Sequence, residues 1–597
     1  MQYVLQPVYA MNRKPSPQQE KILNAHGKFI VNACAGSGKT LTLSKKLVQL
    51  IENNTEPHSG IATLSFTNTA WKEIKKNFDE WGLEIKYPNF LGTFDRFINK
   101  YIFYKYYYLL EEFDKRPTLV GDLGTPWRRK QHMYDYQQYF DIFSFNSKNR
   151  VIKTKKINTF FKFKEDPTDG HYQNIEKMKN DIYPEGFVTQ ADINYFSLKL
   201  IQKFDFISEN IANKFPIFLI DEAQDTNDIK MEIMNIILNK ENIKEFLFIG
   251  DFNQAIYEWN GANPELFEKL SEKYYTIDLT ENWRSSQNIC NFSSKLSKIE
   301  CLAVNNEVKD YSFVPKINEF KEPKDNKSEF FNNIISDFLN LCEKKGITEN
   351  IAVLCKGNTL IKTINGQNDF NYKELFEDNK NITYDLIHSR YLFDNKKFEE
   401  SYLKLEQILS YLSLHKKHIS YNQRKEFVSN IGFFNMRKIC FDLINIMPPT
   451  QNITVREWIK KFKIRLKKSD FKMKEKISSE IKINLEDNEL LIHELFNIDQ
   501  HSKKFTLSTI HGVKGETFDA TLLILKTKTD NGSYKRIIEK FNENNKMEED
   551  LRNVYVGITR PKKILVMEVP KIHVKMWHEL FFDDPYRGKN QSSLLDF

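Results

Sequence analysis

The sequence predicts an α/β protein in which parallel strands alternate with helices. Three apolar segments carry this prediction, because each ends in the kind of polar motif found at the carboxyl ends of parallel strands. Residues 29–31 precede a glycine-rich loop, residues 217–220 precede Asp221, and residues 246–249 precede Gly250. Such ends line one crevice of an open sheet, so the three motifs are expected to meet at one ligand site.

The first motif, at residues 33–40, reads Ala-Cys-Ala-Gly-Ser-Gly-Lys-Thr and predicts a phosphate-binding loop. Two glycines let the backbone N–H groups turn toward phosphate oxygens, and the following helix presents its positive end to the same anion. Lys39 can reach the β and γ phosphates of a nucleotide, and Thr40 can ligate Mg²⁺. A glycine-rich turn without a ligand is the alternative, but the strand before the loop and the Gly-Lys-Thr ending favour nucleotide binding. The expected nucleotide contacts are Ala35, Gly36, Ser37, Gly38, Lys39 and Thr40.

The second and third motifs supply candidate catalytic groups. Asp221 suits the coordination shell of Mg²⁺, and Glu222 suits activation of a water for attack on a γ-phosphate. A solvated acidic turn is the alternative, but it leaves the apolar strand before these residues unexplained. Gln254 is placed to sense a phosphate, whereas Tyr257 and Trp259 offer flat faces that are more often part of a core.

Composition limits the classes of protein that fit. The 597 residues predict several domains, and 28% charged residues predict a globular chain. Six scattered cysteines without a Cys-x-x-Cys pair argue against zinc, iron–sulfur clusters and disulfides. The chain shows no apolar run of membrane-spanning length and no signal-peptide pattern, so a cytoplasmic location without a membrane partner is expected. A net charge of +8 permits a nucleic-acid partner without requiring one.

With these motifs in order, the chain resembles the UvrD/Rep branch of superfamily 1 DNA helicases, known as superfamily 1A. Further blocks match in family order from Gln18 to Arg560. The resemblance implies that Gln18 reads adenine, that Trp283 covers one adenine face, and that Arg284 and Arg560 reach the γ-phosphate. The catalytic set implied by the resemblance and the motifs together is Lys39, Asp221, Glu222, Gln254, Arg284 and Arg560.

The resemblance also implies a grip on single-stranded DNA by stacking and by backbone contacts. Phe66, Tyr257 and Trp259 are expected to stack on bases, and Thr67, Thr93 and His511 to bond phosphates. The block at residues 64–70 adds Asn68 to the expected DNA contacts.

Some positions depart from the family pattern. Asp95 stands in place of a common histidine, and Asn260 in place of a common arginine. The family glutamate of the block at 509–516 is displaced by one position, so either Glu516 or Thr517 could take its nucleotide contact. Coupling between ATP and DNA is therefore expected to differ in detail from the family.

The fold implied by the resemblance is two RecA-like P-loop NTPase lobes, with parallel sheets flanked by helices and a mainly helical insertion in each lobe. Apolar runs at residues 351–354, 505–508, 521–525 and 564–567 predict strands of the second lobe. The expected boundaries are 1–100 and 205–278 for the first lobe, 101–204 for its insertion, 279–371 and 503–580 for the second lobe, 372–502 for a reduced helical insertion, and 581–597 for a flexible tail.

The expected activity is that of an ATP-dependent 3′–5′ translocase or helicase acting on single-stranded DNA and its junctions with duplex, in repair, replication or anti-phage defence. The compact plan also resembles the helicase-like subunit of Gabija anti-phage systems, which implies an alternative role as a DNA-end- or nucleotide-sensing ATPase beside a nuclease partner. A third interpretation, a P-loop switch unrelated to nucleic acid, leaves Phe66, Trp259 and the arginine pair unexplained. Residues Gln591–Phe597 resemble a sliding-clamp-binding peptide.

Overall fold

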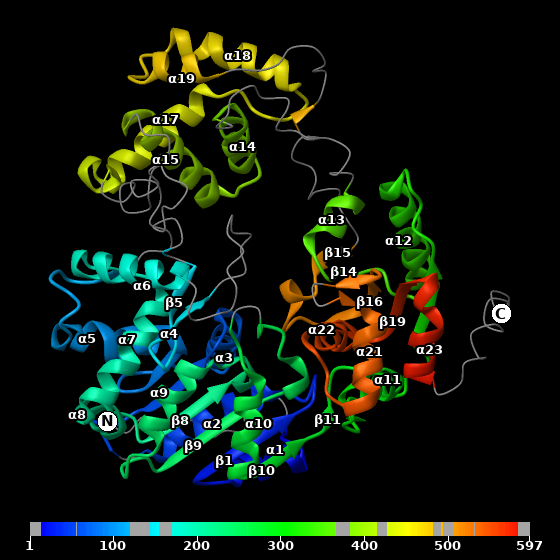
Figure 1. Ribbon diagram of the computed structural model, residues 1–597. Helices are drawn as coiled ribbons and strands as arrows, with labels where there is room; N and C mark the ends of the chain where they lie inside the picture. The colour runs from blue at the N-terminus through cyan, green and yellow to red at the C-terminus, as the bar shows by residue number, and fades with distance from the viewer. Residues whose placement is uncertain are drawn as a thin grey trace.

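The computed structural model describes residues 14–54, 56–119, 140, 142–154, 170–258, 261–365, 382–414, 427–481, 491–492, 505–529 and 532–582. Two parallel sheets, each flanked by helices, form the two lobes in the lower part of Figure 1, and a group of helices lies above them. This arrangement confirms the predicted α/β fold class.

The sheet of the first lobe has six parallel strands in the order β10-β1-β9-β8-β2-β3. They are β1 (Lys28–Ala33), β2 (Ile61–Ser65), β3 (Phe90–Thr93), β8 (Ile217–Asp221), β9 (Glu245–Gly250) and β10 (Tyr275–Leu279). Alternate side chains of β1 enter two cores: Phe29 and Val31 pack with α1, α2 and α3, whereas Ile30 packs with α9 and α10 on the opposite face. The helices are α1 (Pro17–Asn24), α2 (Lys39–Asn53), α3 (Asn68–Glu80), α9 (Asp228–Leu238) and α10 (Pro264–Lys273).

The segment between β3 and β8 shares the core of the first lobe, because α7 packs on α9. Its helices are α4 (Phe94–Ile98), α5 (Tyr104–Tyr106), α6 (Gly170–Ile182), α7 (Gln190–Lys203) and α8 (Asp205–Lys214). Two small strand pairs complete the segment: β4 (Thr118–Leu119) with β7 (Phe187–Val188), and β5 (Phe143–Phe145) with β6 (Val151–Lys153).

The sheet of the second lobe has five parallel strands in the order β13-β19-β16-β14-β15. They are β13 (Lys316–Phe320), β14 (Ile351–Cys355), β15 (Phe505–Thr509), β16 (Phe518–Ile524) and β19 (Pro561–Pro570). One face packs against α11 (Gln287–Ser297), α21 (Tyr534–Asn544), α22 (Glu549–Ile558) and α23 (Val574–Phe582). The other face packs against α12 (Lys327–Lys344) and α13 (Asn358–Ile364). Short strands β11 (Glu281–Asn282) and β12 (Leu302–Ala303) pair beside the interface between the lobes, and β17 (Lys528–Thr529) pairs with β18 (Gly532–Ser533).

The helices that follow α13 and precede β15 form a separate core at the top of Figure 1. They are α14 (Ile382–Asp394), α15 (Phe398–Leu414), α17 (Phe433–Ile446), α18 (Val455–Lys468) and α19 (Lys474–Glu480). In α18 the apolar residues Trp458 and Phe462 are buried, while most of the lysines and arginines of the same helix are exposed.

All six cysteines lie among the described residues and are buried as free thiols. Within the ranges that the structure describes, no helix combines the length and the apolar character needed to cross a membrane. Trp259 and the peptide Gln591–Phe597 lie outside the described residues.

Candidate nucleotide site between two lobes

The phosphate-loop motif joins β1 to α2 at the carboxyl edge of the first sheet. Gly36 and Gly38 have φ angles of +76° and +79°, a region that glycine occupies without strain. The Thr40 hydroxyl donates a hydrogen bond to Asp221 Oδ2 over 3.2 Å, which joins the first motif to the second. Lys39 is 9% exposed. The sheet therefore brings the predicted loop, lysine and carboxylate together.

The pKa values of the two adjacent carboxylates at the end of β8 shift in opposite directions. Burial and the charge of Glu222 raise the pKa of Asp221 to about 7. Burial also works against ionisation of Glu222, but the positive charges of Lys514 and Lys39 outweigh it and lower its pKa. Glu222 has a φ of +53°, a left-handed backbone that costs a non-glycine residue about 1–3 kcal/mol. Its surroundings therefore hold this carboxylate in a defined place.

A chain of side-chain hydrogen bonds runs from Glu222 toward the second lobe. The Gln224 amide donates to Glu222, and its Oε1 accepts from the Asp251 backbone N–H over 3.1 Å. Gln254 Nε2 donates to Asp251 Oδ2 over 2.6 Å, and Gln254 Oε1 accepts from Arg560 Nη2 over 3.2 Å. The predicted glutamine of the first lobe thus links Asp251 to the predicted arginine of the second lobe.

The two predicted arginines lie beside the interface but are held differently. Arg560 is 1% exposed, and burial together with the charge of Arg284 lowers its pKa to about 9. Arg284 Nη1 donates to Thr559 O over 3.1 Å, and its Cβ would lie 2.8 Å from a Cβ added at Gly36. The segment containing Arg284 therefore packs directly on the phosphate loop.

The backbone around Arg284 is also tied to that loop. Asn282 Nδ2 donates to Ala35 O over 2.8 Å, and the Trp283 N–H donates to Gly36 O over 2.8 Å. The Ser37 hydroxyl donates to Cys34 O within the loop itself, over 2.8 Å.

The adjacent residues Gln18 and Gln19 contact different segments of the first lobe. Gln18 Oε1 accepts from the Thr280 N–H over 2.8 Å, and its Nε2 donates to the Thr280 hydroxyl over 3.1 Å. Gln19, which was not among the predicted site residues, donates to Ser37 O over 3.3 Å. Its place next to Gln18 was the available signal. Glu516 has an exposed side chain, and its backbone O accepts from Arg560 Nη1 over 3.4 Å.

Lys514 is another site residue that the sequence motifs did not indicate. Its Nζ donates to Asp225 Oδ2 over 2.7 Å and to Gln254 O over 3.0 Å. Burial lowers the pKa of Lys514, but the charge of Asp225 raises it, and the net shift is upward. Burial raises the pKa of Asp225 to about 6. Lys514 belongs to the block at 509–516 and Asp225 follows Asp221 by four residues, so their charges were the available signal.

Four of the residues expected to contact DNA lie at the ends of the neighbouring strands β2 and β3 or directly after them. The Phe66 ring stacks on Phe94 at 5.3 Å between centroids, and Lys230 Nζ lies 5.8 Å from its centroid. Thr67 and Thr93 each cap a helix through the side-chain oxygen, at α3 and α4. Asn68 begins α3.

Two other expected DNA contacts lie where the lobes meet. The Tyr257 ring is 6.0 Å from the His511 ring and 4.7 Å from Lys514 Nζ. His511 Nε2 lies 3.0 Å from Ile256 O, so this imidazole contacts the backbone of the first lobe.

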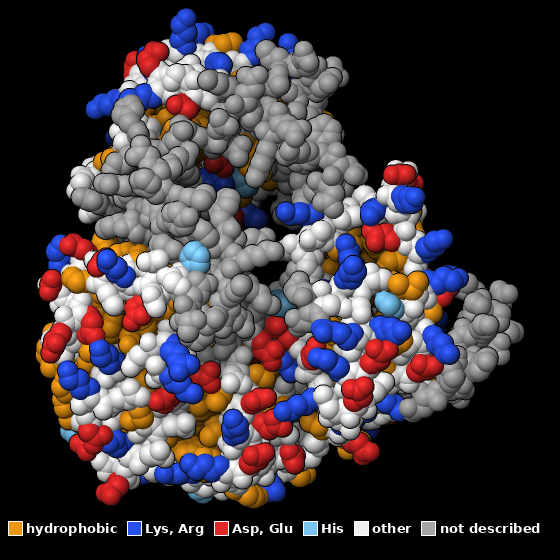
Figure 2. All heavy atoms as spheres, viewed as in Figure 1, with side chains coloured by type: hydrophobic (Ala, Val, Ile, Leu, Met, Phe, Trp, Pro, Cys, Tyr) orange, Lys and Arg blue, Asp and Glu red, His pale blue; other side chains and the backbone are white. Residues whose placement is uncertain are grey.

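On the face seen in Figure 2, acidic and basic side chains are interspersed over both lobes.

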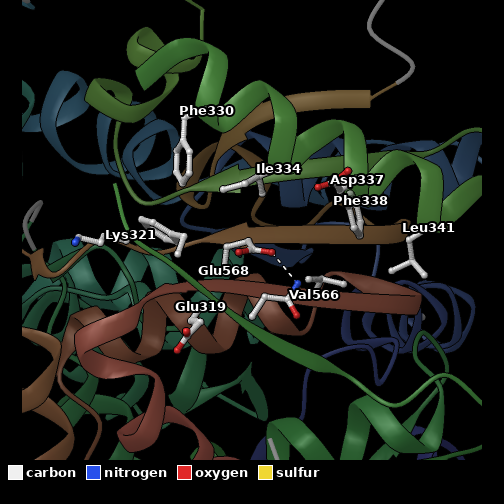
Figure 3. Close-up of a pocket in the computed structure, with 11 residues that line it drawn as sticks. Glu319, Lys321, Phe330, Ile334, Asp337, Phe338, Leu341, Val566 and Glu568 are labelled. Atoms are coloured by element: carbon white, nitrogen blue, oxygen red, sulfur yellow. Dashed lines mark hydrogen bonds between the residues drawn. The ribbon is translucent and has the colours of Figure 1, made fainter. Parts of the chain in front are cut away.

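A groove of about 390 Å³ lies away from this interface, between α12 and strands β13 and β19 (Figure 3). Phe330, Ile334 and Phe338 of α12 line it opposite Glu568, whose Oε1 accepts from Asn318 Nδ2 over 2.8 Å. Burial raises the pKa of Glu568 to about 7, against the opposing effect of this hydrogen bond.

Two family models match the chain. The UvrD/REP helicase N-terminal domain matches residues 15–275, and the UvrD-like helicase C-terminal domain matches residues 450–571. The chain belongs to the UvrD-like family of ATP-dependent DNA helicases.

Individual relatives agree with this assignment. The chain is 23% identical to an ATP-dependent DNA helicase Rep of Buchnera aphidicola, over 97% of this chain and 96% of the relative. It is 24% identical to an ATP-dependent DNA helicase PcrA of Staphylococcus epidermidis, over 47% of this chain and 40% of that protein. It is 29% identical to the Gabija protein GajB of Bacillus cereus, over 46% of this chain and 48% of that protein. The latter two alignments thus span less than half of each relative.

Proposed function

We propose that this protein hydrolyses ATP at the interface between its lobes and uses the cycle to move 3′ to 5′ along single-stranded DNA, opening duplex at junctions. The observation that carries the proposal is the hydrogen-bond chain from Glu222 to Arg560, with Gln254 in the middle. A chain that joins a carboxylate of one lobe to an arginine of the other can report the state of a phosphate between them.

Each side chain has a role that suits its surroundings. Lys39 binds the phosphates of ATP, and Glu222, kept ionised by Lys514 and Lys39, accepts a proton from the attacking water. Arg284 and Arg560 offset charge that develops on the transferred phosphoryl group. Gln18 and Trp283 contact the adenine, and the backbone at Glu516 orients Arg560.

The oxygens of Thr40 and Asp221 fit a magnesium ion, because Mg²⁺ prefers hard oxygen ligands and keeps several waters and phosphates. The raised pKa of Asp221 fits as well, since a nearby cation would offset its burial. Among the described residues no group of three or more His, Cys, Asp or Glu could hold a metal ion, so phosphates and water would complete the shell. When bound, Mg²⁺ supplies positive charge to the phosphates.

We assign DNA binding to the residues that the sequence indicates, which are Phe66, Thr67, Asn68, Thr93, Tyr257, Trp259 and His511. Aromatic rings stack on bases at about 1–3 kcal/mol per base without reading sequence. Binding should therefore be independent of sequence and should weaken steeply with salt.

The test compares ATP hydrolysis with and without an oligonucleotide of defined length. Wild-type turnover should rise with single strands, and Lys39→Ala and Glu222→Gln should abolish it. Displacement of streptavidin from a 3′- or 5′-biotinylated strand reports direction, and release from the 5′ end supports 3′ to 5′ movement. Turnover that no DNA or RNA strand stimulates would contradict the proposal.

A second function is favoured by the 29% identity to GajB. In this alternative the chain senses DNA ends or nucleotide for a nuclease partner and unwinds little. Co-purification with the product of the neighbouring gene, followed by a strand-displacement assay on the complex, separates the two functions. Stable association without displacement supports the sensor.

Residues Gln591–Phe597 are proposed to bind a sliding clamp. Deleting them should remove clamp binding while leaving the DNA-stimulated ATPase intact. Unchanged binding to a purified clamp would remove this proposal.

A further inference from the structure

Three consecutive carbonyls of the first lobe contact side chains of the second lobe. The contacts join Gln254 O to Lys514 Nζ at 3.0 Å, Ala255 O to Arg552 Nε at 2.6 Å, and Ile256 O to His511 Nε2 at 3.0 Å. Of these side chains, Arg552 alone has no role in the proposed hydrolysis or DNA binding, and it was not selected from the sequence.

Arg552 makes two contacts with the first lobe through one planar group. Besides Ala255 O, its guanidinium pairs with the Glu258 carboxylate, and its side chain is only 11% exposed. Burial lowers the pKa of Arg552, and Glu258 opposes this shift. These two partners lie on either side of Ile256 and Tyr257, so Arg552 spans the backbone that carries the Tyr257 ring.

Helix α22 (Glu549–Ile558) links this contact to the nucleotide side of the interface. Arg552 lies within the helix, and Arg560 follows its end and donates to Gln254 Oε1. One helix of the second lobe therefore holds the segment at residues 254–258 at both ends. A rigid helix that contacts both ends transmits a shift at one end to the other.

We propose that Arg552, through Glu258, is the positioning residue that couples the nucleotide cleft to the DNA-facing ring of Tyr257. This inference rests on the proposed function. The planar fork of arginine bonds a carbonyl and a carboxylate in a fixed geometry, which a lysine ammonium on a flexible stem does not reproduce. Loss of the fork leaves the ATP residues in place but allows Tyr257 to move independently of α22.

The experiment uses the full chain with Arg552→Lys and Glu258→Gln. The matched control is Lys546→Met, because Lys546 pairs with Glu265 and Glu268 of the first lobe at 3.7 and 3.6 Å and is 66% exposed. The control removes an interface cation without touching residues 254–258. Basal ATP turnover, turnover with single-stranded DNA and the thermal midpoint are measured for each.

Each coupling variant should reduce the stimulation by DNA about tenfold, as expected for an allosteric coupling of ordinary size. Basal turnover and the thermal midpoint should stay near wild type, and the control should keep full stimulation. The double variant should lose no more stimulation than either single variant, because both changes break one link.

Two outcomes overturn the inference and remain distinguishable. If DNA stimulates wild-type turnover and stimulates both variants as strongly as wild type, the coupling role alone is wrong. If basal turnover and thermal midpoint fall together with stimulation, Arg552 is structural and the coupling role is again wrong. A wild-type enzyme that no strand stimulates overturns the proposed function itself.

Discussion

The Nζ of Lys514 lies 2.7 Å from Asp225 Oδ2 across the interface between the lobes, and the two side chains are 7% and 2% exposed. Burying two charges is costly, and their attraction compensates only when the pair stays intact. The same ammonium lowers the pKa of Glu222. One cation of the second lobe therefore both joins the lobes and keeps the proposed general base ionised.

Replacing Lys514 with Met should lower the thermal midpoint and reduce ATP turnover, because Asp225 would remain buried without its partner at a cost of about 3–5 kcal/mol. Lys528→Met, at an exposed position of the same lobe, is the control. The double change Lys514→Met with Asp225→Leu should recover much of the stability but little of the turnover. A single variant as stable as wild type would argue against the pair.

Gly36→Ala should raise the KM for ATP by more than tenfold. An added Cβ would lie 2.8 Å from Arg284 Cβ and 2.9 Å from Asn282 Oδ1, so the segment on the phosphate loop would have to shift. Gly27→Ala separates this effect from backbone strain, because Gly27 has a φ of +85° but no atom within 4 Å of its added Cβ. Both variants lose some stability, on the order of 1 kcal/mol. Equal KM values for the two would contradict the packing argument.

Lys179→Met should destabilise the segment between β3 and β8. Lys179 and Asp192 are both fully buried and lie 2.8 Å apart, and Asp192 also accepts from Ser144, Tyr183 and Thr189. Breaking a buried pair costs about 3–5 kcal/mol, whereas the exposed Lys177→Met should cost under about 0.5 kcal/mol. Thermal unfolding and limited proteolysis of both variants check this prediction, and equal midpoints would refute it.

Stability should depend on pH through Glu568. Its pKa rises from the ordinary 4.5 to about 7 on folding, so its contribution is fully present below pH 4.5 and is lost as the pH rises through 7. At about 1.4 kcal/mol per pH unit, the full contribution is on the order of 3 kcal/mol. Glu568→Gln keeps an oxygen acceptor for Asn318 and cannot ionise, so it should become increasingly more stable than wild type between pH 5 and 8.

The measurement is the thermal midpoint of wild type and Glu568→Gln across that range, with the exposed Glu329→Gln as control. A difference between wild type and Glu568→Gln that stays constant with pH would mean that Glu568 does not titrate as proposed.

Much of the fold could be predicted because strands and loops carry local signals. The apolar runs at 29–31, 217–220 and 246–249 are strands, and the polar motifs after them lie at one edge of the sheet. Runs at 351–354, 505–508 and 564–567 are likewise strands of the second sheet. Alternation and turn chemistry act over a few residues, so they can be read without knowing the fold.

The contacts across the interface could not be predicted in the same way. Within the first lobe, Gln18 bonds Thr280 and Gln19 bonds the phosphate loop, and neither partner is indicated by the local sequence. Lys514 and Arg552 were missed because their partners Asp225 and Glu258 lie 289 and 294 residues away. No local pattern states which of many lysines and arginines will be buried against a distant carboxylate.

Local residue types place a phosphate loop, two carboxylates and a glutamine at the ends of the strands. Folding then selects the distant cations that meet these groups and sets the burial of each group. The ionisation of Asp221, Glu222 and Asp225 depends on this loss of solvent and on the charges that folding brings close. Neither quantity exists in the unfolded chain.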